Sequence, residues 1–292
     1  MKKILITICI LFFLILPLSA QDEKELIIRC DDIGMNHDVN IAFEKVLQTG
    51  VPASASLMVP CPWFQVAVEI INKYDNASAG LHLTLNAEWK NYRWGPVSGP
   101  SVVPSLVDSL GYFFPSRAKL FANNPKTSEV EIELRAQIKR AQDSGLKIDY
   151  LDYHMGAAVQ TPELRSLVEG LAKEYGFGIS QYFNEDYSSA TYFAKIGSKT
   201  DSLVKRVVKI EPGTLALQVF HISFNTPEMS ALKDLNPFGP KDMSDQRADE
   251  LKALLSDRFT IAIKDNNIKL VNYRDIIAKH GLKNIQKPTQ AY

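Results

Sequence analysis

The stretch LIIRCDDIGMNHD, residues 26–38, ends an apolar run with two adjacent carboxylates. Its first three residues are typical of a buried strand, and Asp31 and Asp32 follow shortly after them. Two like charges side by side repel one another, and burial disfavours each charged form. A bound cation would offset both costs, so this stretch predicts that further ligands of a cation lie near the end of the strand.

Strand-like and helix-like segments alternate along the chain, which indicates an α/β fold with a parallel sheet and helices outside it. The predicted strands are 25–30, 54–59, 78–85, 147–154, 177–181, 214–222 and the start of 268–281. The predicted helices are 39–50, 63–74, 128–145, 161–176, 244–257 and the rest of 268–281. Residues 87–127, rich in Trp, Tyr, Pro and Gly, are expected to be irregular.

Three helix starts carry capping signals in the sequence. Ser128 and Glu131 have the spacing of a capping box. Thr161 precedes Pro162, as an N-cap precedes a proline in the first helical turn. Ser244 is expected to cap the helix that begins beside it.

The N-terminal segment, residues 1–20, has the pattern of a secretory signal peptide. Two lysines precede an apolar stretch, and the small residues Ser19 and Ala20 suit cleavage after Ala20. An uncleaved membrane anchor is the alternative, but the apolar run 4–16 is short for a bilayer span. We therefore expect a single mature domain, residues 21–292, in the periplasm and without a stable membrane span.

Charge and cysteine content narrow the class of protein further. Removal of the signal peptide would leave 31 basic and 33 acidic residues, a balance that does not suit a nucleic-acid partner. Cys30 and Cys61 would remain, and outside the cytoplasm they could form a disulfide, although two buried thiols fit as well. Neither cysteine lies in an arrangement that predicts a nucleophile.

Three of the five histidines, His82, His154 and His221, lie where predicted strands end. Asp31 and Asp32 share this position, and the carboxyl ends of strands in a barrel meet at one mouth. One carboxylate and two imidazoles suit a borderline divalent ion such as zinc, with one position left for water and a second carboxylate as general base. A single histidine could be structural, and the aspartate pair could serve a turn. Their coincidence on separate strands favours a metal site.

Four segments in order resemble the YdjC-like (ChbG–HpnK) family of carbohydrate deacetylases. Residues 29–59 resemble its Asp-Asp opening with the helix and strand that follow. GLHLTL at 80–85 resembles its Gly-x-His strand, LDYH at 151–154 its Leu-Asp-Ser-His, and VFHISFN at 219–225 a later strand. The resemblance spans about residues 26–277 and implies a NodB-like architecture, a distorted (β/α) barrel with parallel strands and a divalent metal.

Carried over by position, the resemblance gives a role to each of these polar residues. Asp32, His82 and His154 would hold the metal, with zinc expected first and magnesium or cobalt as alternatives. Asp31 would be the general base, and His221 the general acid that protonates the leaving amine. The implied reaction is hydrolysis of an N-acetyl group on an amino sugar or a short oligosaccharide.

The chain departs from the family pattern in three places. Met155, Gly156 and Ala157 replace a histidine-rich run, Tyr153 replaces a serine, and Ile222 replaces a proline. We expect these departures to change which substrate is bound more than which reaction is catalysed.

Candidate substrate contacts are the aromatic and hydrogen-bonding side chains near these motifs: Asn36, Asn86, Trp89, Tyr92, Arg93 and Trp94. The three aromatic rings could stack on sugar rings, or they could anchor their own loop. Two other functions remain open, a metal hydrolase of another amide or ester on the same scaffold, and a non-catalytic carbohydrate-binding relative. No feature of the sequence predicts an oligomeric state.

Overall fold

The apolar run quoted above lies in β1, Lys24–Ile33, the strand around which the sheet is built. The computed structural model describes residues 23–237, 239, 241–283 and 285–288, so the predicted signal peptide lies outside the described residues. Every residue of β1 after Lys24 is buried. Apolar side chains of β1 pack with those of neighbouring strands and helices in the main core, which explains why this run is so apolar.

All strand pairings in the described part of the chain are parallel. The other strands are β2 Ala53–Leu57, β3 Ala77–Leu83, β4 Ile148–Tyr153, β5 Gly178–Ile179, β6 Asp186–Ser188, β7 Leu215–Phe220 and β8 Ile268–Val271. Their order is β5-β4-β3-β2-β1-β7-β6, and β8 pairs with the first part of β1. The sheet therefore curls as part of a barrel, and the prediction of a distorted (β/α) barrel with parallel strands is confirmed.

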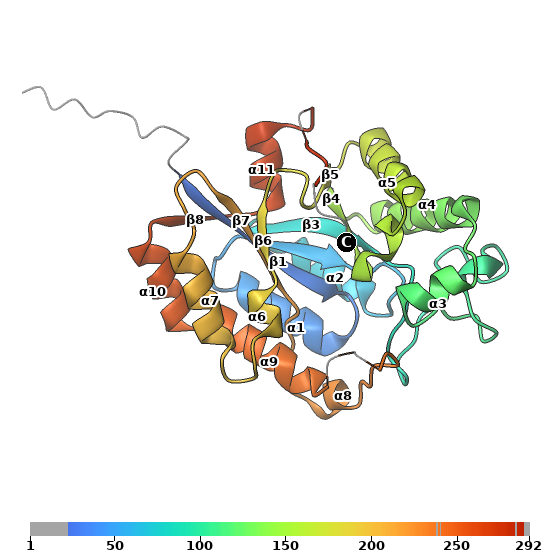
Figure 1. Cartoon of the computed structure of the whole chain (residues 1–292), viewed down its shortest axis with the longest axis horizontal. Helices are drawn as coiled ribbons and strands as arrows, with labels where there is room; N and C mark the ends of the chain where they lie inside the picture. Colours follow the sequence, from blue (N-terminus) through green and yellow to red (C-terminus); the bar gives the residue numbers. More distant parts are fainter. Residues whose placement is uncertain (1–22, 238, 240, 284, 289–292) are drawn as a thin grey trace, which may run out of the picture.

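Helices surround the curled sheet (Figure 1). They are α1 His37–Leu47, α2 Phe64–Ile71, α3 Arg117–Ala122, α4 Thr127–Asp143, α5 Pro162–Tyr175, α6 Ala190–Phe193, α7 Lys199–Val208, α8 Pro227–Ser230, α9 Met243–Leu254, α10 Asp257–Asp265 and α11 Tyr273–His280, with 3₁₀ turns η1 Pro104–Leu106 and η2 His154–Val159. Figure 1 shows α4 and α5 beside the β3–β4 side of the sheet, and α7, α9 and α10 grouped on the other side. Between β3 and α4 the chain is largely irregular, as expected.

The predicted caps agree with the structure at one helix and fail at two. The Thr161 hydroxyl accepts a hydrogen bond from the Leu164 amide at 3.2 Å, which confirms the start of α5. The predicted capping box at α4 is wrong. The helix begins at Thr127, so Ser128 already lies inside it, and no side chain caps its N-terminus. The predicted cap at α9 is also wrong, since Ser244 lies within that helix and donates its hydroxyl to Asn225.

Two expectations about cysteine and membrane crossing can be compared with the structure. Cys30 and Cys61 are buried free thiols, so the alternative without a disulfide is the one observed. Burial raises the pKa of both thiols, which keeps them protonated and unreactive.

Among the residues that the structure describes, no helix combines the length and the apolarity that crossing a bilayer requires.

Candidate active site

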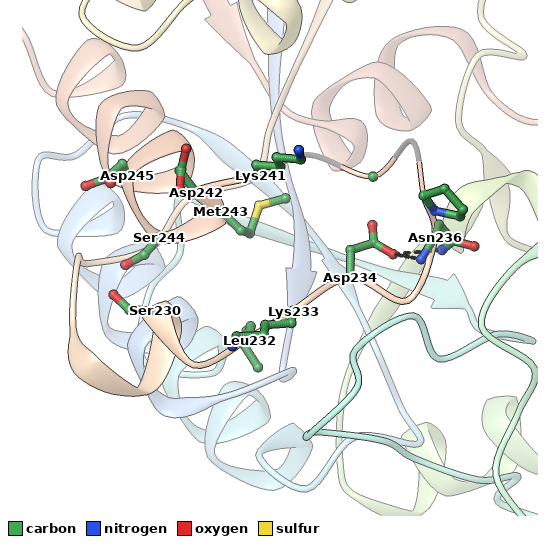
Figure 2. Close-up of a pocket in the computed structure, with 12 residues that line it drawn as sticks. Ser230, Leu232, Lys233, Asp234, Asn236, Lys241, Asp242, Met243, Ser244 and Asp245 are labelled. Carbon is green, nitrogen blue, oxygen red and sulfur yellow. Dashed lines mark hydrogen bonds between the residues drawn. The ribbon is translucent and has the colours of Figure 1, made fainter.

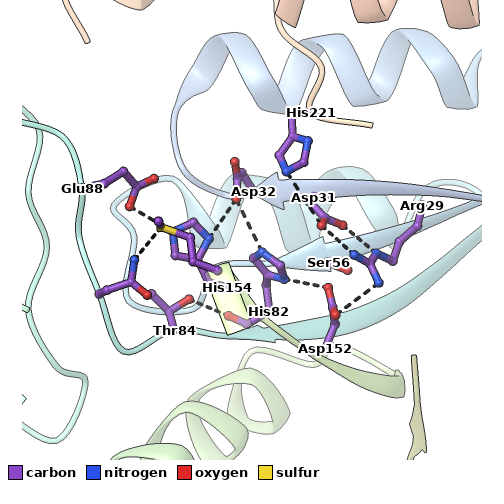
Figure 3. A network of polar contacts seen from close by, with 12 residues as sticks. Arg29, Asp31, Asp32, Ser56, His82, Thr84, Glu88, Asp152, His154 and His221 are labelled. Carbon is purple, nitrogen blue, oxygen red and sulfur yellow. Dashed lines mark hydrogen bonds and ion pairs between the residues drawn. The ribbon is translucent and has the colours of Figure 1, made fainter. Parts of the chain in front are cut away.

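The end of β1 directs both aspartates toward one polar network. In a regular strand, neighbouring side chains point to opposite faces of the sheet. The register between β1 and β2 shifts between Cys30 and Ile33, and Asp32 has a φ of 63°. A local irregularity of this kind changes the direction of side chains, and Figure 3 shows Asp31 and Asp32 both within the network. The adjacent carboxylates thus depend on a distorted strand end.

Asp32, His82 and His154 lie together, as the sequence predicts. Asp32 Oδ1 lies 3.6 Å from His82 Nε2 and 3.3 Å from His154 Nδ1. All three side chains are buried, and one ligand atom from each lies within 4.8 Å of the other two. Among the described residues, Asp32 Oδ1 has no hydrogen-bond partner. A carboxylate oxygen beside two imidazole nitrogens is a donor set that suits a divalent metal ion.

The second nitrogen of each imidazole is held by a further carboxylate (Figure 3). His82 Nδ1 donates to Asp152 Oδ2 at 2.8 Å, an interaction between directly paired positions of β3 and β4. His154 Nε2 donates to Glu88 Oε2 at 3.0 Å. Such partners fix the ring orientation and, when a metal is bound, the tautomer, so that the nitrogens facing Asp32 are the ones available to ligate it. The residues present therefore fit a divalent ion.

The charges around this cluster favour a cation within it. Burial by itself raises the pKa of Asp32, but Arg247 and His154 together lower it well below its usual value. Burial lowers the pKa of His154, whereas Glu88 and Asp32 raise it to about 10. An imidazole between two carboxylates thus occupies a position where positive charge is stabilised.

Asp31 lies in the same network on the side of His221. The Arg29 side chain donates to Asp31 Oδ1 at 2.7 Å and to Asp31 Oδ2 at 2.8 Å. His221 Nε2 lies 4.0 Å from Asp31 Oδ2, and the His221 side chain is 25% exposed. The backbone N–H of His221 donates to Glu250 Oε2 at 2.7 Å. The arginine thus fixes the carboxylate beside an imidazole that can exchange protons with solvent or a bound molecule.

A second possible ligand group combines Asp31, His82 and Asp152. In that group both oxygens of Asp31 already accept from Arg29, and Asp152 Oδ1 lies 3.2 Å from the same guanidinium. Burial raises the pKa of Asp152, but Arg29 and then His82 lower it to about 2. Because these oxygens are already paired with a cation, the group that contains Asp32 is the better metal site.

Two of the three rings of the predicted aromatic platform are enclosed in the structure, and Tyr92 is partly buried. Trp89 and Trp94 are only 2% and 3% exposed, so neither presents a face to a sugar ring. Trp94 Nε1 donates to the Asn86 carbonyl at 3.0 Å. The Tyr92 hydroxyl donates to the Met35 carbonyl at 2.6 Å. These contacts correspond to the alternative in which the aromatic residues anchor their own loop.

Arg93 and Asn36 also make structural contacts. Arg93 Nη1 donates to Asp108 Oδ2 at 2.6 Å, and a second nitrogen donates to a backbone carbonyl. The Asn36 side chain accepts from the Val39 amide at 3.0 Å and thereby caps α1. Its amide nitrogen lies 2.9 Å from Met229 Sδ. Their assignment as substrate contacts stays a prediction from the sequence.

A polar pocket of about 550 Å³ lies between α8 and the start of α9 (Figure 2). Asp234, Asp242, Ser244 and Asp245 contribute to its wall. Neither of the two candidate ligand groups lines it. Its described lining offers hydrogen-bonding groups but no cluster of histidines, so the network in Figure 3 is the better candidate site.

Four charged residues of the network were not predicted as site residues: Arg29, Glu88, Asp152 and Arg247. Asp152 lies in the LDYH segment, two residues before a predicted ligand, and Arg29 lies two residues before Asp31. Both spacings place side chains on one face of a strand, a signal that the sequence does contain. Glu88 lies in an irregular segment, and Arg247 lies in a helix far along the chain. No local sequence pattern indicates that either side chain reaches the site.

Comparisons with known proteins agree with this geometry. The chain is 26% identical over 268 residues to a carbohydrate deacetylase of Thermoanaerobacter pseudethanolicus, covering 86% of this chain and 98% of the relative. It is 29% identical over 261 residues to a carbohydrate deacetylase of Brevibacillus brevis, covering 86% and 99% of the two chains.

Solved structures show the same fold at lower sequence identity. A proposed cellobiose-phosphate cleavage protein from Enterococcus faecalis superposes with a TM-score of 0.72 at 22% identity, covering 87% of this chain and 99% of the other. A peptidoglycan N-acetylglucosamine deacetylase superposes with a TM-score of 0.51 at 12% identity, covering 91% and 92%. The family model described as YdjC-like protein matches residues 25–265, and this chain therefore belongs to the YdjC-like family.

Proposed function

We propose that this chain is a metal-dependent hydrolase that removes N-acetyl groups from amino sugars or short oligosaccharides. Two relatives named carbohydrate deacetylase align with it over 98% and 99% of their own lengths, which supports the reaction class. The observation that carries the proposal is Asp32 Oδ1, which accepts no hydrogen bond from a described residue and lies 3.6 Å and 3.3 Å from a ring nitrogen of His82 and of His154.

The metal would be held by Asp32, His82 and His154. Zinc suits one carboxylate and two imidazoles best, and magnesium and cobalt are the alternatives to be tested. A divalent ion in this position would polarise the acetyl carbonyl and lower the pKa of the attacking water. Glu88 and Asp152 would keep the two imidazoles in the orientation that ligation requires.

Asp31 and His221 would handle the protons of the reaction. Asp31 would accept a proton from the attacking water as the new carbon–oxygen bond forms. His221 would donate a proton to the amide nitrogen as the carbon–nitrogen bond breaks, so that acetate and a free amine leave. Their separation of 4.0 Å between Nε2 and Oδ2 is compatible with a base and an acid that serve one reacting group.

The test is a screen of N-acetylated mono- and oligosaccharides for acetate release, with zinc, cobalt or magnesium added to the purified protein. We expect turnover of at least one N-acetylated sugar with at least one of these metals. Acetylated esters in the same screen separate the deacetylase from an esterase on the same scaffold. Binding of metal without turnover of any N-acetylated sugar would contradict the proposal.

We also propose that residues 1–20 direct export of the chain and that it acts in the periplasm. The lysines and the apolar run of this segment support export. N-terminal sequencing of the protein made in its native host tests this proposal. We expect the mature chain to begin at Gln21, and an intact Met1 in a cytoplasmic fraction would contradict it.

A further inference from the structure

A pocket of about 320 Å³ lies directly beside His221. Phe193 and Lys195 line it from α6 and the residues just after, and Gln246 and Arg247 line it from α9. His221, the proposed general acid, thus lines a recess formed by segments that follow β6 and β7. No role in the proposed reaction has yet been given to this recess.

The proposed reaction restricts where the sugar can lie. The amide nitrogen that receives the proton from His221 is bonded to a ring carbon of the sugar. The sugar ring must therefore lie close to the His221 imidazole. The acetyl group then lies between the sugar ring and the proposed metal ligands Asp32 and His82. The recess is lined by His221 itself, whereas Trp89 and Trp94 are enclosed in the core.

The exposed ring of Phe193 gives the recess an apolar surface. Phe193 is 76% exposed, so a face of its ring is open to a bound molecule. Its ring centroid lies 5.0 Å from that of Tyr192, and the Tyr192 ring in turn lies 5.0 Å from the His221 ring. The phenylalanine is thereby held at the edge of the recess, one ring away from the imidazole.

Two polar side chains of the recess have no partner among the described residues. The Lys195 ammonium and the Gln246 amide make no side-chain hydrogen bond to any described residue, and Lys195 is exposed. A sugar ring has an apolar C–H face and hydroxyl groups around its edge. One open aromatic face with a few hydrogen-bonding groups beside it is the combination that binds such a molecule.

We infer that this recess is the subsite for the sugar that carries the acetamido group, with Phe193 packed on the ring and Lys195 and Gln246 bound to its hydroxyls. The inference rests on the proposed function and replaces the predicted platform of Trp89 and Trp94. Met243 lines both this recess and the pocket in Figure 2, so the two hollows adjoin.

The test measures binding of triacetylchitotriose by calorimetry to the zinc-loaded protein in which Asp31→Asn prevents turnover. Adding Phe193→Ala should weaken binding about threefold to tenfold, the value of one aromatic contact. Phe193→Tyr should restore it, and Leu110→Ala, which removes an apolar side chain that is 75% exposed elsewhere, should have no effect.

A second measurement covers the case in which the Asp31→Asn background does not fold. In the otherwise wild-type enzyme, Phe193→Ala should raise KM for the same sugar about threefold to tenfold and leave kcat within about twofold. Equal binding by the Phe193→Ala and Leu110→Ala variants, or no binding of the sugar by the parent, would overturn the inference. If the sugar binds through Phe193 but no sugar is deacetylated, the proposed function fails and the subsite stands.

Discussion

The two sides of the site differ in how completely their polar groups are paired. On the side of the candidate ligands, His82 and His154 each have one nitrogen held by a carboxylate, and Arg247 holds Oδ2 of Asp32. On the side of His221, the imidazole Nδ1 is buried without a partner among the described residues, and the side chain of Gln246 is free as well. On the ligand side, the orientation of the two imidazoles is set before any ligand binds. On the side of His221, polar groups are available to a ligand.

This difference indicates a division of labour. Buried charges are costly unless each is compensated, so a network of carboxylates and guanidinium groups persists only where the geometry is needed. Groups that must adapt to a substrate gain from being exposed and unpaired before it binds. We therefore expect changes on the paired side to affect metal binding, and changes on the open side at residues other than the proposed acid His221 to affect affinity for sugar.

The largest expected effect follows from removal of either predicted imidazole ligand. His82→Ala or His154→Ala should weaken zinc binding by on the order of 100-fold or more, because a ligand contributes at least as much as the groups that orient it. Calorimetric titration of the metal-free protein with zinc measures this. His280→Ala, an exposed histidine at the end of α11, is the control and should bind zinc as the wild type does. Unchanged affinity in both ligand variants would rule out this site.

Asp31→Asn should separate chemistry from metal binding. Loss of the general base should lower kcat by about 10²- to 10⁴-fold, whereas zinc affinity should stay close to that of the wild type. Acetate release and zinc titration on the same preparation measure both quantities. Loss of zinc binding in this variant would instead favour the alternative group of Asp31, His82 and Asp152.

Glu88→Gln tests whether the carboxylate behind His154 matters to the metal site. The amide keeps the shape of the side chain but loses the charge that orients the imidazole, so zinc affinity or activity should fall about 10- to 100-fold. Glu163→Gln on the exposed first turn of α5 is the matched control and should change neither. An equal response of the two variants would mean that Glu88 only fills space.

The smallest expected effects concern packing beneath the site. Gly80 lies in the strand that carries His82, and a Cβ there would come within 2.3 to 2.5 Å of the Tyr150 ring. Gly80→Ala should therefore lower the free energy of unfolding by about 1–3 kcal/mol, because the added methyl group has no room. Gly170→Ala in α5, where the added Cβ would point into open space, should raise it by about 0.5–1 kcal/mol. Urea denaturation measures both, and similar changes in the two variants would contradict the packing argument.

The sequence predicts the convergence of Asp32, His82 and His154 because the carboxyl ends of parallel strands meet at one edge, whatever the details of packing. It does not predict how both aspartates come to face one network, because this depends on the distorted end of β1 and the positive φ of Asp32. Strand periodicity alone would have placed Asp31 and Asp32 on opposite faces.

The residues that long-range packing brings to the site are the ones that sequence patterns miss. Arg247 reaches Asp32 Oδ2 at 2.5 Å across 215 positions of the chain, and nothing near Arg247 in the sequence indicates this contact. An aromatic residue in a loop is equally compatible with a binding surface and with a core. The structure encloses Trp89 and Trp94 and exposes Phe193, a distinction that depends on tertiary contacts alone.

The zinc dependence of acetate release is the most direct test of the account. The protein is stripped with a chelator, zinc is returned in steps, and the rate of acetate release from an N-acetylated oligosaccharide is followed. The account predicts no turnover in the stripped protein and a rate that rises with zinc until each chain holds one ion. Full turnover by the stripped protein would contradict the claim that Asp32, His82 and His154 work by holding a metal.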